Sequence, residues 1–380
     1  MKDINYRFSP NVSPKTISRV KKIDKLLDFI LPKPVQAPVI PIKTIAITQL
    51  AHIGDLILML PALKKIKMLG NYHINLVVSS QNYLIASKLT FIDSVSVVDA
   101  PYFARGKKVS YFKFISQLRK IKADLVFDCR GDLRNNIFIK LFTKKKIFAG
   151  YNVGGGDAVL DVVLPYGHNK HITGLLDPLF DFLSLPEVDL SSCWSPNNIP
   201  YEEIKGHVFP DEFIVVHLGA GAKSRQWGVK NFTETIKAVS DFTPVYVLGI
   251  NADASEEEIQ KLANIPNVTV CIGKYSILQS MYILKHCSLF LGLDSGFSHI
   301  AAMFKKKVIV LFSGAANQDV WKPFNFYNNQ VTVVKRPVPC DFITGCGKLV
   351  CADNICMKEI YPIEVIKLLQ EHLENKISSF

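Results

Sequence analysis

No apolar stretch in this 380-residue sequence approaches the ~20 residues that a membrane-spanning helix requires. The best candidate is interrupted by His52, Gly54 and Asp55. The N-terminal "MKDINYRFSP" also lacks the apolar core of a secretory signal. We therefore expect a cytoplasmic protein, in which the eight cysteines are mostly reduced.

Two common nucleotide-binding fingerprints are missing as well. No G-x-G-x-x-G opens the first helical run, so the sequence does not favour a dinucleotide-dependent dehydrogenase. The segment "HLGAGAKS" ends like a P-loop, but Ala222 replaces the glycine before the lysine and His217 occupies the place of the first glycine. A P-loop nucleotide-binding site is therefore not expected either.

Negative charge is in deficit, with 33 Asp and Glu against 45 Lys and Arg, and the excess is concentrated in two segments. Residues 1–43 carry a net charge of +6 and residues 103–148 a net charge of +10, which leaves −4 for the remainder of the +12 total. Such clustering predicts an anionic surface or substrate. Solvated helix faces are the alternative for any single lysine. A nucleic-acid partner has only this charge in its favour, because no recognition motif or aromatic stacking platform is present.

Short β-branched runs alternate with longer periodic runs along both halves of the chain. Strands are predicted in the first half at "KTIAITQL", "INLVVSS", "SVSVVDA", "ADLVFDCRG" and "KIFAGY", and in the second at "FIVVHLGAG", "PVYVLGI", "VTVCIG", "LFLGLDSG" and "KKVIVLFSG". This alternation predicts an α/β fold with two parallel, doubly wound sheets. The join is expected in the turn-rich residues 191–206.

Loops that follow strands are where an open α/β sheet binds its ligands. Three stand out: "QLAHIGD", "HLGAGAKSRQW" and "LGLDSGFSH". The last two precede the helical runs "NFTETIKAV" and "HIAAMF", where N–H groups at a helix start could hold a phosphate or diphosphate.

Five collinear segments resemble the successive signatures of the family nine glycosyltransferases, the lipopolysaccharide heptosyltransferases. They are "QLAHIGDLILMLPALKKI", "ADLVFDCRGDLRNN", "VVHLGAGAKSRQW", "LGLDSGFSHIAAMFKKKVIVLFSGAANQDVWKPF" and "CMKEIYPIEVI", which span roughly residues 43–370. The resemblance implies the GT-B fold, two Rossmann-like domains facing a cleft. It also implies inverting transfer of heptose, or a related sugar, from an ADP-sugar to a lipopolysaccharide core or similar anionic glycolipid, without a metal or other cofactor.

Carried across by position, the resemblance makes Asp55 the catalytic carboxylate. The donor-binding group is Gly54, Gly219, Lys223, Arg225, Asp294, Ser295, Gly296 and His299. The acceptor-binding group is His52, Arg130 and Arg134. The two arginines are placed there because they follow the strand "DLVFDC" at the cleft edge, where phosphates and carboxylates of a lipid A and Kdo core are suitable partners; the family usually has Gln at the position of Arg130. Arg225 departs from the family's usual lysine but retains the charge and adds bidentate geometry, with Lys223 as a second candidate for the phosphates.

Each assignment has a structural alternative. Asp55, Asp294 and Ser295 could simply cap the helices that follow them, His299 could be a core histidine, and Arg130 and Arg134 could be surface loop residues. Trp227 and Trp321 are expected to pack rather than stack on a ligand. Cys340, Cys346, Cys351 and Cys356 are separated by five, four and four residues, so one pair is wider than a usual zinc site has. They are taken as a structural loop, with a metal site as the alternative.

The expected organisation has four parts. Residues 1–42 form a basic arm, 43–200 an acceptor-binding domain, 201–360 a nucleotide-sugar-binding domain, and 361–380 a C-terminal helix. In the arm, apolar residues at helical spacing (Ile17, Val20, Ile23, Leu27 and Ile30) alternate with Arg19, Lys21, Lys22 and Lys25. Such a helix could lie on anionic lipid at the cytoplasmic face of the inner membrane, or pack against the protein's own body. A sugar-nucleotide-binding protein without catalysis is the alternative function.

Overall fold

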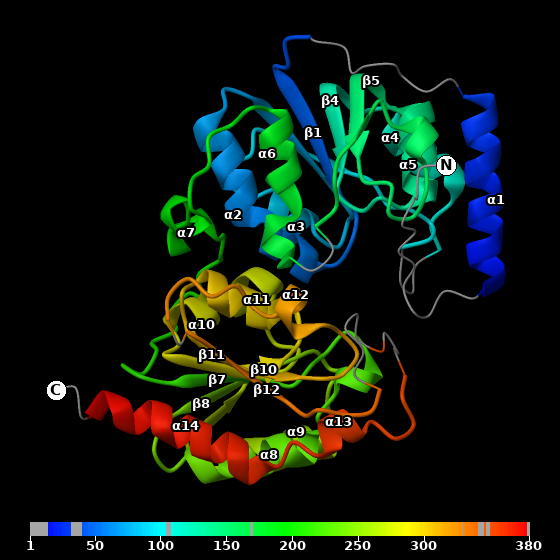
Figure 1. Ribbon diagram of the computed structural model, residues 1–380. Coiled ribbons are helices and arrows are strands. Elements are labelled where there is room, and N and C mark those ends of the chain that lie inside the picture. The colour runs from blue at the N-terminus through cyan, green and yellow to red at the C-terminus, as the bar shows by residue number, and fades with distance from the viewer. Residues whose placement is uncertain are drawn as a thin grey trace. The chain divides into compact units, whose positions relative to one another are not determined.

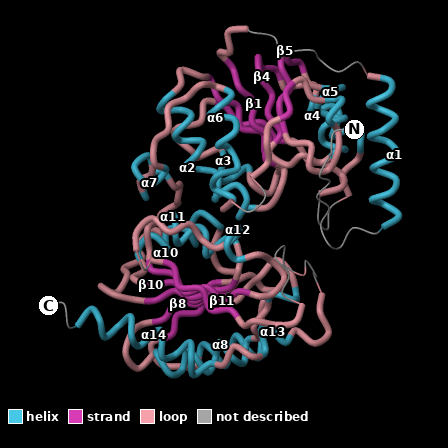
Figure 2. The backbone as a smooth tube through the Cα atoms, in the orientation of Figure 1, coloured by secondary structure: helices cyan, strands magenta, loops and turns pink. Residues whose placement is uncertain are grey.

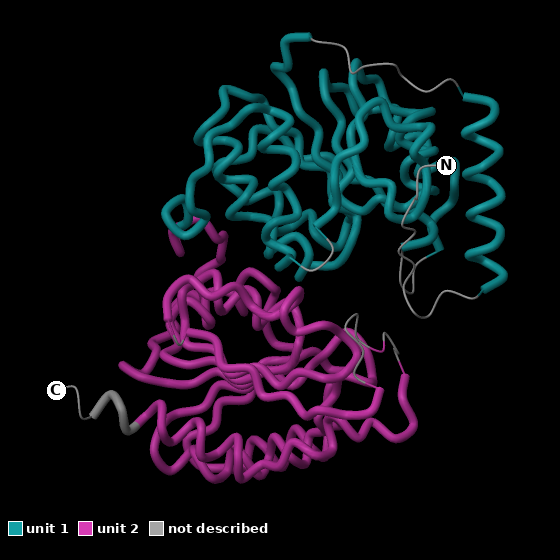
Figure 3. Tube along the Cα trace, in the orientation of Figure 1, with its two compact units in different colours: residues 1–194 teal, residues 195–380 magenta. Residues whose placement is uncertain are grey.

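The computed structural model describes residues 14–31, 40–103, 108–167, 170–328, 330–340, 346 and 350–377. The chain divides into two compact units, unit 1 (Met1–Trp194) and unit 2 (Ser195–Phe380), coloured separately in Figure 3. The division falls within the predicted join at residues 191–206. Each unit is described by itself below.

Unit 1 is built on a parallel six-stranded sheet in the order β3-β2-β1-β4-β5-β6. Its strands are β1 (Thr44–Gln49), β2 (His73–Val78), β3 (Ser94–Val97), β4 (Lys122–Asp128), β5 (Lys144–Gly150) and β6 (Val162–Val163). Its helices are α1 (Pro14–Ile30), α2 (Ile53–Leu69), α3 (Tyr83–Ala86), α4 (Tyr111–Leu118), α5 (Leu133–Phe142), α6 (Asp177–Phe182), α7 (Leu190–Cys193) and the 3₁₀ turns η1 (Asp157–Val159) and η2 (Ile172–Leu176). Helices α2 and α6 lie on one side of the sheet and α4 and α5 on the other (Figure 1).

Unit 2 repeats this plan with a parallel sheet in the order β12-β11-β10-β7-β8-β9. Its strands are β7 (Ile214–His217), β8 (Val245–Leu248), β9 (Val268–Val270), β10 (Leu289–Leu293), β11 (Lys307–Phe312) and β12 (Val331–Lys335). Its helices are α8 (Val229–Val239), α9 (Glu256–Ala263), α10 (Ile277–His286), α11 (Gly296–Met303), α12 (Gln318–Trp321), α13 (Ile355–Lys358), α14 (Pro362–Ile377) and the 3₁₀ turns η3 (Pro196–Asn198) and η4 (Lys223–Arg225). Helices α10 and α11 cover one face, and α8, α9 and α14 cover the other (Figure 1).

Burial explains why these runs fold as they do. The strands β7, β8 and β10 are buried at every residue, as expected for parallel strands covered on both faces. Helix α2 is also buried along most of its length, from Leu56 to Ile66, which accounts for an apolar run without a polar face. The two doubly wound sheets confirm the predicted fold class. The predictions missed β6 and β12, each a short partner added at the end of a sheet.

The expected apolar face of the N-terminal helix is wrong in part. Helix α1 packs on η1 with Ile17, Val20 and Leu27 half-buried, but Ile23 and Ile30 are exposed. The inward face is centred instead on Asp24, which is fully buried and accepts a hydrogen bond from the Gly156 N–H at 2.6 Å. A buried carboxylate that satisfies a backbone donor from a distant loop has no signature in local periodicity. Within the described residues, no helix combines the length and apolar character needed to cross a membrane.

Candidate functional site

The predicted site residues collect at the point in each sheet where the strand order reverses. In unit 1 this point lies between β1 and β4, and in unit 2 between β7 and β10. The connections leave these neighbouring strands in opposite directions, which opens a crevice at the carboxyl edge of the sheet. Figure 2 shows the strands at the centre of each unit and the loops that leave them. These two edges are the candidate sites.

The turn after β1 places Asp55 at the start of α2. His52 is the exposed residue that precedes the helix, and Gly54 is the second residue of the helix. The Asp55 carboxylate is half-buried, and its Oδ2 accepts a hydrogen bond from the His52 N–H at 3.1 Å. The capping role weighed as an alternative for Asp55 is therefore present in the structure. Among the described residues, no donor contacts the second oxygen, Oδ1.

A buried carboxylate that sequence reasoning missed organises the opposite loop. Asp128, the last residue of β4, is fully buried and accepts the Thr48 hydroxyl at 2.6 Å and the Gly131 N–H at 2.9 Å. Burial raises the pKa of Asp128, and these hydrogen bonds act in the opposite direction. Gly131 has φ +64°, and a Cβ there would lie 2.7 Å from the Tyr151 carbonyl oxygen, so the turn requires glycine. The sequence signal was available in "FDCRGD", a carboxylate at a strand end followed by glycine.

The two predicted arginines of this loop lie over neighbouring aromatic rings but differ in their partners. The Arg130 guanidinium is exposed and lies 4.4 Å from the Phe103 ring centroid, whereas that of Arg134 lies 4.3 Å from the Tyr102 ring. Arg134 also donates two hydrogen bonds to Asp132, at 3.0 and 2.8 Å, which raise its pKa. Within the described ranges no carboxylate pairs with Arg130. Arg130 is therefore the arginine of this loop without an ion-pair partner among the described residues.

Cys129 links the two loops of unit 1 electrostatically. Burial raises the pKa of the Cys129 thiol, and the negative charges of Asp128 and Asp55 raise it further. The Cys129 N–H also donates to the Thr48 carbonyl across the two strands, at 3.2 Å. Asp55 and the turn that begins with Arg130 therefore lie at the same edge of the unit 1 sheet.

In unit 2 the two predicted loops meet through an ion pair. The Arg225 Nη1 of η4 lies 3.0 Å from Oδ2 of Asp294, which follows β10. The Asp294 side chain is only 4% exposed and that of Arg225 30% exposed, so the pair is largely removed from water. Lys223, two residues earlier, is exposed. Asp294 therefore anchors the arginine, whereas Lys223 adds positive charge that no ion pair balances in the described part of unit 2.

The start of α11 follows this ion pair directly. Ser295 is the residue that precedes the helix, Gly296 is its first residue, and the Ser298 hydroxyl donates to the Ser295 carbonyl at 2.7 Å. The Ser295 Oγ is buried and has no hydrogen-bond partner among the described residues. His299, on the same helix, is buried. Unpaired N–H groups and a hydroxyl at a helix start are suited to an anionic group.

Sequence analysis did not identify Asp253 and His217, two further residues at this edge of the sheet. A Cβ at Gly219 would lie 2.4 Å from Oδ2 of Asp253, so the loop after β7 approaches this carboxyl closely because it carries glycine there. Burial raises the pKa of Asp253. His217, the last residue of β7, stacks on Phe297 with ring centroids 4.3 Å apart. Neither residue has a local motif that singles it out.

The packing role predicted for Trp227 is confirmed. It is buried in the core of unit 2, and its indole N–H donates to the Ile360 carbonyl at 2.8 Å. Trp321, at the end of α12, is half-buried. Among the residues that the structure describes, no group of three or more His, Cys, Asp or Glu is placed to hold a metal ion.

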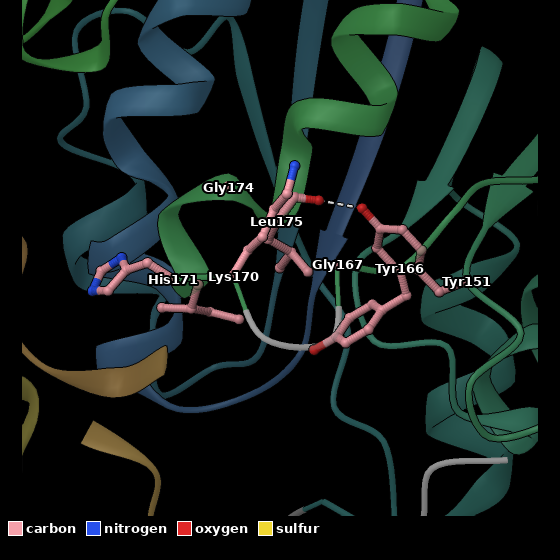
Figure 4. A pocket seen from close by; sticks show the side chains of 8 residues that line it. Tyr151, Tyr166, Gly167, Lys170, His171, Gly174 and Leu175 are labelled. Carbon is pink, nitrogen blue, oxygen red and sulfur yellow. Dashed lines mark hydrogen bonds between the residues drawn. The ribbon is translucent and has the colours of Figure 1, made fainter. Parts of the chain in front are cut away.

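Two cavities in unit 1 contain none of the predicted residues. The smaller, of about 10 Å³, has room for one water molecule beside Tyr151, Tyr166 and His171, and the Tyr151 hydroxyl donates to the Leu175 carbonyl next to it (Figure 4). The larger, of about 570 Å³, lies between α2 and α6 and is lined by Lys65, Phe180 and Asp177 among others. The predicted chemistry therefore lies at the carboxyl edges of the sheets and in neither cavity.

Comparison with known proteins gives a consistent family. Residues 111–344 match the sequence model of "Glycosyltransferase family 9 (heptosyltransferase)". Two curated relatives are lipopolysaccharide heptosyltransferase 3 proteins of Escherichia coli. The one from strain K12 is 28% identical over 168 residues, which is 41% of this chain and about half (48%) of that relative. The other is 24% identical over 306 residues, 73% of this chain and 85% of the relative.

Solved structures agree on the fold. A family 9 glycosyltransferase from Veillonella parvula DSM 2008 matches with a TM-score of 0.70 and 17% identity, over 90% of this chain and 100% of its own. E. coli heptosyltransferase WaaC with ADP matches with a TM-score of 0.65 and 15% identity, over 87% and 99%. Both fold likenesses include the first sheet, which begins before the region matched by the family model.

Proposed function

Because this chain belongs to glycosyltransferase family 9, we propose that it transfers heptose, or a related sugar, from an ADP-sugar to a lipopolysaccharide core or similar anionic glycolipid, with inversion at the sugar carbon. The family match over residues 111–344 is the observation that carries this proposal. The E. coli enzyme WaaC has been solved with ADP and with ADP-2-deoxy-2-fluoro heptose, which supports an ADP-sugar as the donor.

The donor diphosphate is assigned to the carboxyl edge of the unit 2 sheet. The N–H groups at the start of α11, the buried Ser295 hydroxyl and the exposed Lys223 would face the phosphate oxygens, with Arg225 held in place by Asp294. Gly219, Gly296 and His299, and Gly54 of unit 1, remain assigned to donor binding. These groups provide positive potential where the leaving diphosphate gains charge, so the proposed mechanism requires no metal.

Asp55 is assigned as the general base. The acceptor hydroxyl attacks the anomeric carbon on the face opposite the diphosphate, a new carbon–oxygen bond forms, and the bond to ADP breaks. The hydroxyl proton passes to Asp55, whose Oδ1 has no donor among the described residues, while Oδ2 stays bound to the His52 N–H.

The acceptor is assigned to the loop after β4. Arg130 lies on Phe103 without an ion-pair partner in the described ranges, so it is available for a phosphate or carboxylate of the glycolipid core. His52 is exposed at the same edge and stays in the acceptor group, as does Arg134 with part of its charge balanced by Asp132. A lipid-borne acceptor would bring the protein to the cytoplasmic face of the inner membrane as a peripheral protein.

Asp55→Asn tests the proposal. The amide cannot take the proton at neutral pH, so we expect kcat to fall at least ~10²-fold while ADP binding by calorimetry stays near that of the unmodified protein. Asp189→Asn is the matched control, because Asp189 caps α7 of the same unit through the Ser191 N–H and is not assigned to the site. Its kcat should not change.

The capping bond made by Asp55 favours one second candidate, a sugar-nucleotide-binding protein without catalysis. In that case ADP would bind, no sugar would be transferred by the unmodified protein, and Asp55→Asn would only lower stability. Transfer at an unchanged rate in Asp55→Asn would instead leave the protein an enzyme and remove Asp55 as its base.

A further inference from the structure

Helix α1 presents one face to unit 1 and the opposite face to solvent. The inward face is held by the buried Asp24, whose carboxylate accepts the Gly156 N–H at 2.6 Å, with Ile17, Val20 and Leu27 half-buried around it. A rotation of the helix about its axis would expose this carboxylate and leave the Gly156 donor without its partner. The outward face is therefore fixed by the fold.

The C-terminal half of the outward face is apolar. Phe29 is 89% exposed, Ile30 60%, Leu26 56% and Ile23 46%. We call these four residues the outward cluster. Exposed large apolar side chains that occur singly need no explanation, but four on consecutive turns of one helix mark an interaction surface.

The N-terminal half and flanks of the same face are basic. Lys15, Arg19, Lys22 and Lys25 are exposed. The two acidic residues of the helix, Asp24 and Asp28, are buried and half-buried. The outward face of α1 thus carries positive charge and apolar side chains and no exposed carboxylate of its own.

We infer that the outward face of α1 docks onto an anionic phospholipid surface, with the outward cluster inserted at the level of the acyl boundary and the basic residues among the headgroups. Large apolar side chains combined with basic flanks are what such an interface selects. Each Lys or Arg near an anionic membrane surface strengthens binding roughly fivefold.

Charge complementarity separates this occupant from a second copy of the chain. A self-associated α1 would bring together two outward faces with four exposed cations each, which like-charge repulsion opposes. The chain's own body is already packed on the inward face. The inference is argued from the exposed residues of α1. It rests on the proposed function only for its biological purpose, which is access to a lipid-borne acceptor.

Vesicle sedimentation with the full chain tests the docking. Vesicles of phosphatidylethanolamine with about a quarter phosphatidylglycerol should pellet the protein, whereas phosphatidylcholine vesicles should not, and high salt should weaken the binding. Leu26→Ser combined with Phe29→Ser should lower the partition coefficient at least ~10-fold. Arg19→Gln combined with Lys22→Gln should lower it by a similar factor of roughly 10 or more.

Phe112→Ser is the matched control for loss of an exposed ring. Phe112 is also 89% exposed in unit 1, but it lies on α4, and its replacement should leave vesicle binding unchanged. Equal loss of binding in Phe112→Ser and in the α1 variant would overturn the inference, because general stickiness would explain both. Equal binding to anionic and neutral vesicles would overturn it as well.

The outcomes also separate this inference from the proposed function. Vesicle binding that depends on α1, in a protein that transfers no sugar, would keep the docking and refute the enzyme. Normal ADP binding and normal transfer to a delipidated core acceptor, without vesicle binding, would keep the enzyme and refute the docking. A dimer in analytical ultracentrifugation that is lost in Phe29→Ser, with no vesicle binding, would assign the face to self-association and overturn the inference.

Discussion

Replacement of His217 should reduce the acid sensitivity of unit 2. His217 ends β7 with only 6% of its surface exposed, and its ring stacks on Phe297 at an interplanar angle of 12°. Burial lowers the pKa of His217 to about 4, against about 6.5 in an unfolded chain. Between these values the unfolded chain binds more protons than the folded one. The stability of unit 2 therefore rises with pH from 4 to 6.5 and is lost as the pH falls through that window.

The size of the effect follows from the two pKa values. Integrating the linkage relation from pH 7.5 down to pH 5 gives a loss of about 2 kcal/mol from this one histidine. In His217→Phe the ring stays stacked and nothing titrates, so this loss should disappear. His217→Gln should show the same flattened pH response, but with lower stability at every pH because the stacked ring is gone.

Urea unfolding at the two pH values measures the difference. Trp227 is buried in unit 2 against Phe232, so its fluorescence reports that unit once Trp194 and Trp321 are replaced by Phe in all proteins compared. Other groups titrate in this range, so the quantity of interest is the pH-dependent loss in the parent minus that in His217→Phe. Identical losses in the parent and in both variants would show that the His217 ring is not desolvated as the structure indicates.

Two further predictions concern buried carboxylates and their partners. Arg225→Ala removes the cation that lies 3.0 Å from Asp294, and we expect calorimetry to show that ADP binding is weakened roughly tenfold to a hundredfold. Arg225→Lys should recover part of this affinity. An unchanged affinity for ADP would remove Arg225 from the donor site. Asp24→Ala leaves the buried Gly156 N–H without its acceptor, which costs about 1–3 kcal/mol, so tryptic cleavage within α1 should accelerate roughly tenfold or more. The control Ser18→Ala, exposed on the same helix, should cleave at the parent rate, and an equal rate in Asp24→Ala would contradict the anchoring role.

Periodicity predicted most of the strands because parallel strands covered on both faces must be continuous apolar runs. It failed at β6, which is two residues long, and at β12, whose residues are mostly half-buried at the edge of the sheet. In α1 the apolar spacing predicted a helix but only part of its inward face, since Asp24 is buried there whereas Ile23 and Ile30 are exposed. Local sequence carries no information on a hydrogen bond to Gly156, 132 residues away.

The candidate site was predictable where it depends on loops that follow strands, as for Asp55, Asp294 and the loop at Arg130. What could not be predicted is which charges are already balanced. Arg225 pairs with Asp294 and Arg134 with Asp132, whereas Arg130 lies against an aromatic ring. Asp128 was missed because its role is to hold the turn through backbone N–H groups, a contact that no residue spacing specifies.

The hydrogen bond from the Gly156 N–H to Asp24 constrains the order in which unit 1 folds during synthesis. The ribosome makes α1 before the loop at Gly156, whose N–H donates to Asp24 and which follows 132 residues later, a wait of roughly 7–26 s at typical synthesis rates of about 5–20 residues per second. During that time the Asp24 carboxylate lacks the Gly156 N–H, and the helix must be tolerated as an undocked segment of the nascent chain. Its docking is therefore a late step of unit 1 folding, although α1 comes before every other helix that the structure describes.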